Sequence, residues 1–392
     1  MKLLRTLSTR TLISLIAVVV LLAVGGTALA LAAGGSGGPT PPPKPLDRAI
    51  HDALAAPAPN GVTARIRFVN KLFPSGALLG STGSALMSGA SGRLWLTNDG
   101  RGRIELQSDV GDVQVVWNDS SISVYDASTH TVYKASLPAK ASEHESGHGH
   151  AAPALRAIDE ALSRLGAHAT VSAARPTDVG GRPAYSVSVS PRHDGGLLAS
   201  AALAWDALRG VPLRVAIFAQ GSSSPVLELT VTSISYGSVP AGDVEIPPPG
   251  DARVVNLSPP NGAEKQHGKG TPVTGLAHVQ ASAGFHVVAP KTLVGLPRQD
   301  VRLVGSGESK TALAVYGHGL GGLVLVEHKA GQGGGPQGAM EALPKISLDG
   351  VTAHELATQL GTVLAWQKDG TAFVLGGSLP PAAAEAAARA LP

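Results

Sequence analysis

The chain has 392 residues, of which 43% are hydrophobic, 15% charged and only 4% aromatic, with 49 Gly, 29 Pro and no Cys. This length allows two or three domains, and frequent Gly and Pro favour a β-rich protein over a long helical one. The lack of cysteine excludes disulfides and the lipid-modified cysteine of a bacterial lipoprotein. The formal net charge of +3 equals the charge of Lys2, Arg5 and Arg10, so the remainder is neutral, which argues against nucleic-acid binding.

Residues 1–33 form a hydrophobic segment typical of protein export. No charged residue occurs from Thr11 to Ala33, and a helix of that length would reach about 35 Å, enough to cross a bilayer. Ala28-Leu29-Ala30 also matches an A-x-A cleavage site. The segment is therefore either a cleaved signal peptide or a retained anchor. In both cases we expect the rest of the chain to be extracytoplasmic, anchored in the cell membrane or secreted across the plasma membrane of a bacterium.

Two Pro/Gly-rich segments divide the rest of the chain. Residues 34–45, "GGSGGPTPPPKP", predict a spacer, and residues 251–276 continue a Pro/Gly-rich stretch that begins at Ile246 and predicts a linker. We therefore expect a first domain over 46–250 and a second over 277–392.

The first domain has the pattern of an antiparallel meander. Short amphipathic helices are predicted at 46–56 and 153–165, and alternating strands joined by tight turns fill most of 61–236. Two of these turns are 98–100, Asn-Asp-Gly, and 207–210, Ala-Leu-Arg-Gly. No βαβ rhythm is present.

The second domain is predicted to be smaller and of mixed α+β type. Strands are expected in "GFHVVAP", "DVRLVGSG", "KTALAVYGHG" and "GLVLVEHK". A helix is expected in "TAHELATQLG", a hairpin in "TVLAWQKDGTAFVLGG" and a last helix in "PPAAAEAAARALP".

The stretch "HESGH" at 144–148 matches the H-E-x-x-H motif of zinc metalloproteases. That motif needs a helix, and Gly147 and Gly149 make a helix costly here. A solvated loop is the simplest interpretation. A loose metal site or pH response at His144, His148 and His150 is the alternative, and a protease is the least favoured.

Other short motifs have ordinary explanations. The run "GHGLGG" at 317–322 matches a dinucleotide fingerprint, but a strand rather than a helix follows, which favours a glycine-rich hairpin turn. The pairs His193-Asp194 and His354-Glu355 lack a nucleophile or a further ligand and are interpreted as surface pairs. No cofactor is predicted.

Apolar residues alternate along the early strands and predict one apolar sheet face. An ordinary core and a ligand cavity beneath the short helices both remain possible from this pattern. The strand positions are Leu94, Leu96, Ile104, Leu106, Val113, Val115, Ile122 and Val124, and the facing helix positions are Leu155, Ile158 and Leu162.

The strand run from "GRLWLTNDGRGRIELQS" to "THTVYKASL", followed by "ALAWDALRGVPLRVAIFAQG" and "SVPAGDVEIPPPGDARV", resembles the LolA/RseB superfamily. The second domain resembles RseB/MucB, the sigma-E regulatory proteins, through "GFHVVAP", "YGHGLGGLVLVEH" and "AFVLGGSLPPAAAEAAARAL". The resemblance implies a curved antiparallel half-barrel with short lid helices, followed by a smaller α+β domain. It also implies a hydrophobic cavity for the acyl chains of lipids or lipoproteins, without catalysis.

Two departures distinguish the chain from LolA carriers. The resemblance implies an Arg-Pro pair after the "LWL" strand, where the arginine ties a lid shut, but this chain has Thr97-Asn98-Asp99. The low aromatic content also differs from an aromatic-rich carrier sheet. A tethered lipid-binding or regulatory protein is therefore favoured over a diffusible carrier.

The leading prediction is an extracytoplasmic, non-catalytic protein that binds an acyl chain in its first domain. A regulator that binds a transmembrane anti-sigma factor is the second hypothesis, and a zinc hydrolase that uses "HESGH" is the third. Under the resemblance, the hinge of a lid helix lies at His144, Gly147, His148, Gly149 and His150.

Overall fold

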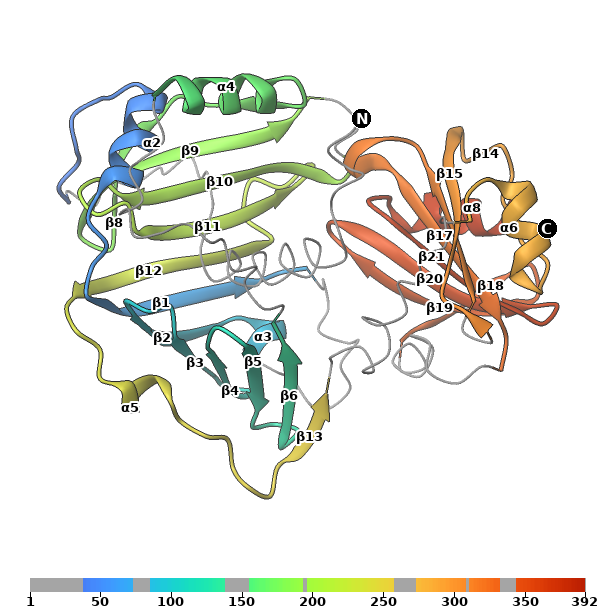
Figure 1. Cartoon of the computed structure of the whole chain (residues 1–392), viewed down its shortest axis with the longest axis horizontal. Coiled ribbons are helices and arrows are strands. Elements are labelled where there is room, and N and C mark those ends of the chain that lie inside the picture. The colour runs from blue at the N-terminus through green and yellow to red at the C-terminus, as the bar shows by residue number, and fades with distance from the viewer. Residues whose placement is uncertain are drawn as a thin grey trace. The chain divides into compact units, whose positions relative to one another are not determined.

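The computed structural model describes residues 38–72, 85–137, 155–192, 196–256, 273–307, 310–331 and 343–391. The chain divides into two units (Figure 1). The first comprises Met1–Lys71, Gly80–Ser190 and Ser200–Pro260, and the second Leu72–Leu79, Pro191–Ala199 and Asn261–Pro392. The predicted export segment 1–33 lies outside the described residues. Within the described part of the chain, no helix is long and apolar enough to cross a membrane.

The first unit is built on one 13-stranded sheet with the order β13-β6-β5-β4-β3-β2-β1-β12-β11-β10-β9-β7, and β8 pairs with β9. The strands are β1 (Gly61–Asn70), β2 (Ala90–Thr97), β3 (Gly102–Ser108), β4 (Gly111–Trp117), β5 (Ser121–Asp126), β6 (Thr131–Ser136), β7 (Ala169–Val171), β8 (Arg175–Val179), β9 (Arg182–Pro191), β10 (Leu198–Asp206), β11 (Pro212–Ala219), β12 (Leu227–Tyr236) and β13 (Arg253–Asn256).

The predicted antiparallel meander is confirmed from β1 to β6, and the pairing of β1 with β12 joins it to the later strands. Strand direction turns strongly between β12 and β6 (Figure 1), which gives the curved, half-barrel type of sheet. The chain segment predicted to begin the linker contains β13, which pairs parallel with β6.

The helices described in this unit are α2 (Leu46–Ala55), α3 (Ala85–Ser88), α4 (Leu155–Gly166) and α5 (Ala241–Val244). Both predicted amphipathic helices, α2 and α4, are present and pack on each other. Ala49 of α2 contacts a cluster that includes Tyr185 and Trp205 of β9 and β10. Because side chains alternate between sheet faces, α2 covers the face opposite to Ala184 and Ala204.

The turn after β10 shows why one glycine is required. Gly210 has φ +65° and donates its N–H to the carbonyl of Asp206 at 2.9 Å. A Cβ on Gly210 would lie 2.1 Å from the carbonyl oxygen of Ala53 in α2. The glycine therefore permits both the left-handed turn and the close approach of the helix.

The second unit has an eight-stranded sheet with the order β14-β15-β16-β17-β21-β20-β19-β18. Its strands are β14 (Thr292–Leu293), β15 (Leu296–Val304), β16 (Thr311–Tyr316), β17 (Leu323–Lys329), β18 (Lys345–Leu348), β19 (Val351–Thr358), β20 (Gly361–Lys368) and β21 (Thr371–Gly377). The helices described in this unit are α6 (Leu276–Ala283), the short 3-10 turn η4 (Gly319–Gly321) and α8 (Pro381–Arg389). The glycine-rich turn predicted at 317–322 does join two paired strands, β16 and β17.

Two predictions for this unit are wrong. Most of the segment "TAHELATQLG" belongs to strand β19 instead of a helix, because β18 and β20 satisfy its backbone on both sides. Asp349 and Gly350 have φ of 49° and 90°, the combination of a two-residue type I′ hairpin turn. The segment "GFHVVAP" contains no strand, and the unpredicted helix α6 precedes it.

Candidate functional site

Strand register in the first unit brings the predicted apolar positions onto one face of the sheet, which we call the apolar face. One row runs from β12 to β5 through Ile234, Ala64, Leu94, Ile104, Val115 and Val124. A second row runs through Tyr236, Val62, Leu96, Gly102, Trp117 and Ile122. All eight predicted strand residues lie on this face, with Leu106 and Val113 in a third row.

Burial varies along this face. Ile104, Leu106, Val113 and Val115 are buried, and helix α3 covers them from one side through Ala85, which is fully buried. The other four predicted positions, Leu94, Leu96, Ile122 and Val124, remain half-buried while packing against the same cluster. Among the eight predicted positions, the more accessible hydrocarbon surface therefore lies on β2 and β5.

The three predicted helix positions lie elsewhere. Leu155, Ile158 and Leu162 belong to α4, which packs mainly against α2 and β7 at the other end of the sheet. Ile158 is buried there. Within the described residues, the structure does not bring these side chains together with the rows on β2–β5. The predicted hinge positions, residues 144–150, lie outside the described residues.

The sequence pattern missed Ile234 and Tyr236 as members of the apolar face. Simple alternation places both residues opposite to Val231, but the register between β1 and β12 shifts at Arg65 and Ile66. Thr232 is left out of the pairing register with β1. The side chains of β12 after Thr232 therefore point to the face opposite to the one that simple alternation predicts. A bulge of this kind leaves no clear signal in one sequence.

A pocket of about 410 Å³ lies on the opposite face, beneath residues 244–248, which we call the strap. The amide of Gln114 on β4 donates to the carbonyl of Ile246 at 3.2 Å, and the guanidinium of Arg103 donates to the carbonyl of Asp243 at 3.0 Å. Polar and apolar groups both line the pocket, including Val116, Ser123, Tyr125, Lys134, Ile246 and Pro247.

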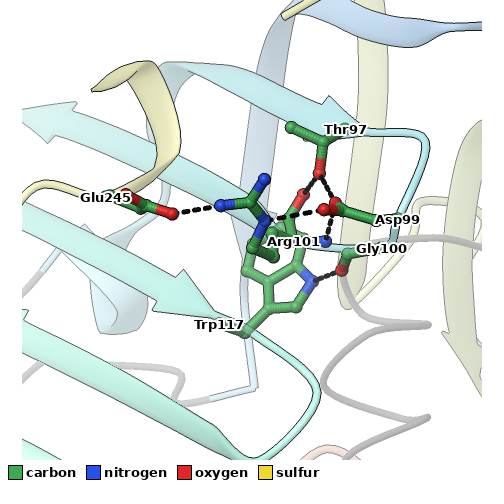
Figure 2. A network of polar contacts seen from close by, with 6 residues as sticks. All are labelled: Thr97, Asp99, Gly100, Arg101, Trp117 and Glu245. Atoms are coloured by element: carbon green, nitrogen blue, oxygen red, sulfur yellow. Dashed lines mark hydrogen bonds and ion pairs between the residues drawn. The ribbon is translucent and has the colours of Figure 1, made fainter. Parts of the chain in front are cut away.

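One rim of this pocket is a network of polar contacts (Figure 2). Arg101 donates to Asp99 at 2.9 Å and also pairs with Glu245 of the strap, while Trp117 donates its indole N–H to the carbonyl of Gly100 at 3.1 Å. The hydroxyl of Thr97 donates to the Asp99 carboxylate, and this hydrogen bond is the main reason that the pKa of Asp99 is lowered. Arg101, which follows the "LWL" strand, therefore does hold a covering segment in place. That segment is the strap and not a lid.

Metal chemistry finds no support among the residues that the structure describes, because no group of three or more His, Asp and Glu side chains is placed to hold an ion. The "HESGH" stretch lies outside that part. His354 and Glu355 do not form the predicted surface pair, because they are neighbours on β19, where successive side chains point to opposite faces.

Comparison with family models and with curated proteins gives no match. Among solved structures, MucB in complex with MucA(peri) is 16% identical over 88% of this chain and 96% of that chain, with a TM-score of 0.41. An uncharacterized conserved protein from Thermus thermophilus is 10% identical over 53% of this chain and 95% of its own, with a TM-score of 0.31.

A putative outer membrane lipoprotein-sorting protein domain from Vibrio parahaemolyticus is 11% identical over 51% of this chain and 96% of that chain, with a TM-score of 0.25. These likenesses concern the fold alone. In fold the chain is similar to MucB and to this lipoprotein-sorting protein domain.

Proposed function

We propose that the chain is an extracytoplasmic, non-catalytic protein that binds an acyl chain of a lipid or lipoprotein on the apolar face of its first sheet. The observation that supports this most directly is the continuous apolar surface across β12, β1, β2, β3, β4 and β5, with half-buried side chains on β2 and β5. Such surface lowers the free energy of binding when a hydrocarbon chain covers it.

The energetics suit reversible binding. Each buried CH₂ group contributes about 0.8 kcal/mol, so roughly ten of them would stabilise a complex by about 8 kcal/mol before the cost of ordering the chain. The apolar rows provide no charged group to attack or protonate a ligand. Binding without bond cleavage is therefore the activity that this face supports.

We expect the full chain, purified in a mild detergent, to retain an acyl lipid that mass spectrometry detects and to take up a fluorescent acyl probe. Val124→Gln should reduce probe uptake about tenfold, because it places an amide on the apolar face. Ser123→Gln is the matched control, since Ser123 precedes it on β5 and faces the other side. Equal uptake by both variants would contradict the assignment of the ligand to this face.

The main alternative is a regulator that binds a transmembrane anti-sigma factor. It would be favoured if the purified chain repeatedly lacks lipid, takes up no acyl probe and instead recovers a single-pass membrane protein. Loss of that partner on deletion of residues 277–392 would place the contact in the second unit.

A further inference from the structure

The face opposite to the apolar rows carries an unusual group of arginines on β1 and β2. Arg65 on β1 lies directly opposite Arg93 on β2, and Ser233 on β12 lies directly opposite Arg65 on its other side. Arg67 follows two residues along β1 and points to the same face. Like charges placed directly opposite each other across two strands destabilise a sheet.

Two neighbouring arginines of this face are already paired. Arg103 on β3 pairs with Glu105, and Arg214 on β11 pairs with Glu228. Among the residues that the structure describes, no carboxylate lies within ion-pair distance of Arg65, Arg67 or Arg93. Glu105 is the cross-strand neighbour of Arg93, but its carboxylate engages Arg103. The patch therefore has an excess of exposed positive charge that a bound anion would neutralise.

A shallow cavity of about 420 Å³ lies at this point of the sheet. Its lining combines guanidinium groups with hydroxyls and one aromatic ring, from Thr63, Arg65, Arg93, Trp95, Ser233 and Ser235. The Trp95 ring lies 4.7 Å from the guanidinium of Arg103, which fixes one wall. The volume falls within the range of small-molecule sites.

We propose that Arg65 and Arg93, with the hydroxyls of Thr63 and Ser233, bind the phosphate group of a phosphate ester. Two guanidinium forks and two hydroxyl donors supply more hydrogen bonds than the two oxygens of a carboxylate accept well, whereas a phosphate monoester presents three terminal oxygens and a phosphodiester two terminal and two ester oxygens. The anion relieves the repulsion between the opposed arginines. The site lies on the opposite face of the sheet from the acyl-binding rows. Evidence against one of the two proposals would therefore not contradict the other.

Phosphate esters reach such a site either as soluble molecules or as the headgroups of phospholipids. The two sources share the recognised group and differ in whether an acyl chain is needed. Binding of glycerol phosphate alone assigns a soluble ligand, and binding of dioctanoyl phosphatidylglycerol without binding of glycerol phosphate assigns a headgroup.

The test uses the full chain in a neutral maltoside detergent, titrated with glycerol phosphate or dioctanoyl phosphatidylglycerol. We expect saturable binding of at least one of the two, weakening as salt rises because the site is exposed. Arg65→Gln/Arg93→Gln should weaken it at least tenfold, since a hydrogen bond to a charged group contributes roughly that factor. Arg175→Gln/Arg253→Gln is the matched control, because both are exposed strand arginines of the same unit.

Thermal unfolding separates binding from a structural role. Without ligand, Arg65→Gln should unfold at the same temperature as the unaltered chain or higher, because it removes the like-charge pair. With saturating ligand, the unaltered chain should gain stability and the variant should not. Arg65→Lys/Arg93→Lys keeps the charge but loses the forks and should bind several-fold more weakly. The proposal is overturned if neither phosphate compound binds, or if the Gln pair and the control pair bind equally.

Discussion

Each unit buries a carboxyl group, and the two groups differ in how many hydrogen-bond donors they have. Asp206 is satisfied, because it accepts the N–H groups of Leu208 and Arg209 at 2.8 and 3.0 Å and the hydroxyl of Tyr236 at 2.7 Å. Glu327 accepts only the N–H of Val288 at 2.7 Å, and its second oxygen is buried without a partner among the described residues. Burial therefore raises the pKa of Glu327 to about 7.

Glu327 makes the second unit less stable at high pH. Its folded pKa of about 7 lies above the ordinary value of 4.5, so between these values the folded state holds a proton that the unfolded state has released. Stability contributed by this proton is present below pH 4.5 and is lost as the pH rises through 7. We expect Glu327→Gln to remove this loss, which amounts to about 3 kcal/mol for a shift of that size.

Urea unfolding of the full chain at pH 5 and pH 8 measures this difference. Asp369→Asn is the control, because it removes an exposed carboxyl of the same unit and keeps a residue suited to the turn. If Glu327→Gln loses as much stability between the two pH values as the unaltered chain, another group is responsible.

At the scale of the elements, alternation predicted the strands well where the neighbours in sequence are also neighbours in the sheet. The rows through Leu94, Ile104 and Val115 follow from successive hairpins. The pattern failed where a distant partner decides. The segment "TAHELATQLG" has helical spacing but forms a strand, because β18 and β20 pair with it on both sides. The turn residues Asp349-Gly350 before it did indicate a hairpin. The placement of α4 away from the rows depends on α2, which the spacing of Ile158 alone does not reveal.

The strap illustrates the same limit. Its prolines suggested a linker, yet residues 244–248 lie against β4 and β5 because side chains of the sheet bind carbonyl groups in and beside it. A proline run lacks N–H donors but keeps every carbonyl as an acceptor. The carbonyls that Gln114 and Arg103 bind belong to Ile246 and Asp243, which precede this run, and neither donor is identifiable as such from the sequence.

We predict that Gln114→Ala loosens the strap without unfolding the sheet. It removes the hydrogen bond to Ile246, and a net loss of about 1 kcal/mol should raise hydrogen exchange at Glu245 and Ile246 roughly fivefold. Gln107→Ala serves as the control, because Gln107 is exposed on the neighbouring strand β3. Hydrogen-exchange mass spectrometry of peptides that cover the strap measures this change. Equal exchange in the two variants would mean that other contacts hold the strap.

At the scale of the whole molecule, the two units have separate hydrophobic cores. The largest cluster of the second unit centres on Leu323, Leu325 and Leu364, and none of its described buried members comes from the first unit. The first unit has its own clusters around Ile104 and around Trp205. With no cysteine in the chain, the stability of each unit depends on its own packing and polar contacts.

Separate cores predict two thermal transitions in calorimetry of the full chain. Raising the pH from 5 to 8 should lower the transition of the second unit by roughly 5 °C or more through Glu327, while affecting the other transition less. Asp206→Ala should lower only the transition of the first unit, by roughly 5–10 °C, because it leaves the Tyr236 hydroxyl and two N–H groups without their acceptor. Glu327→Gln in the same experiment should cancel the pH effect and leave the Asp206 effect intact. A single transition that both changes move together would show that the two cores unfold as one cooperative unit.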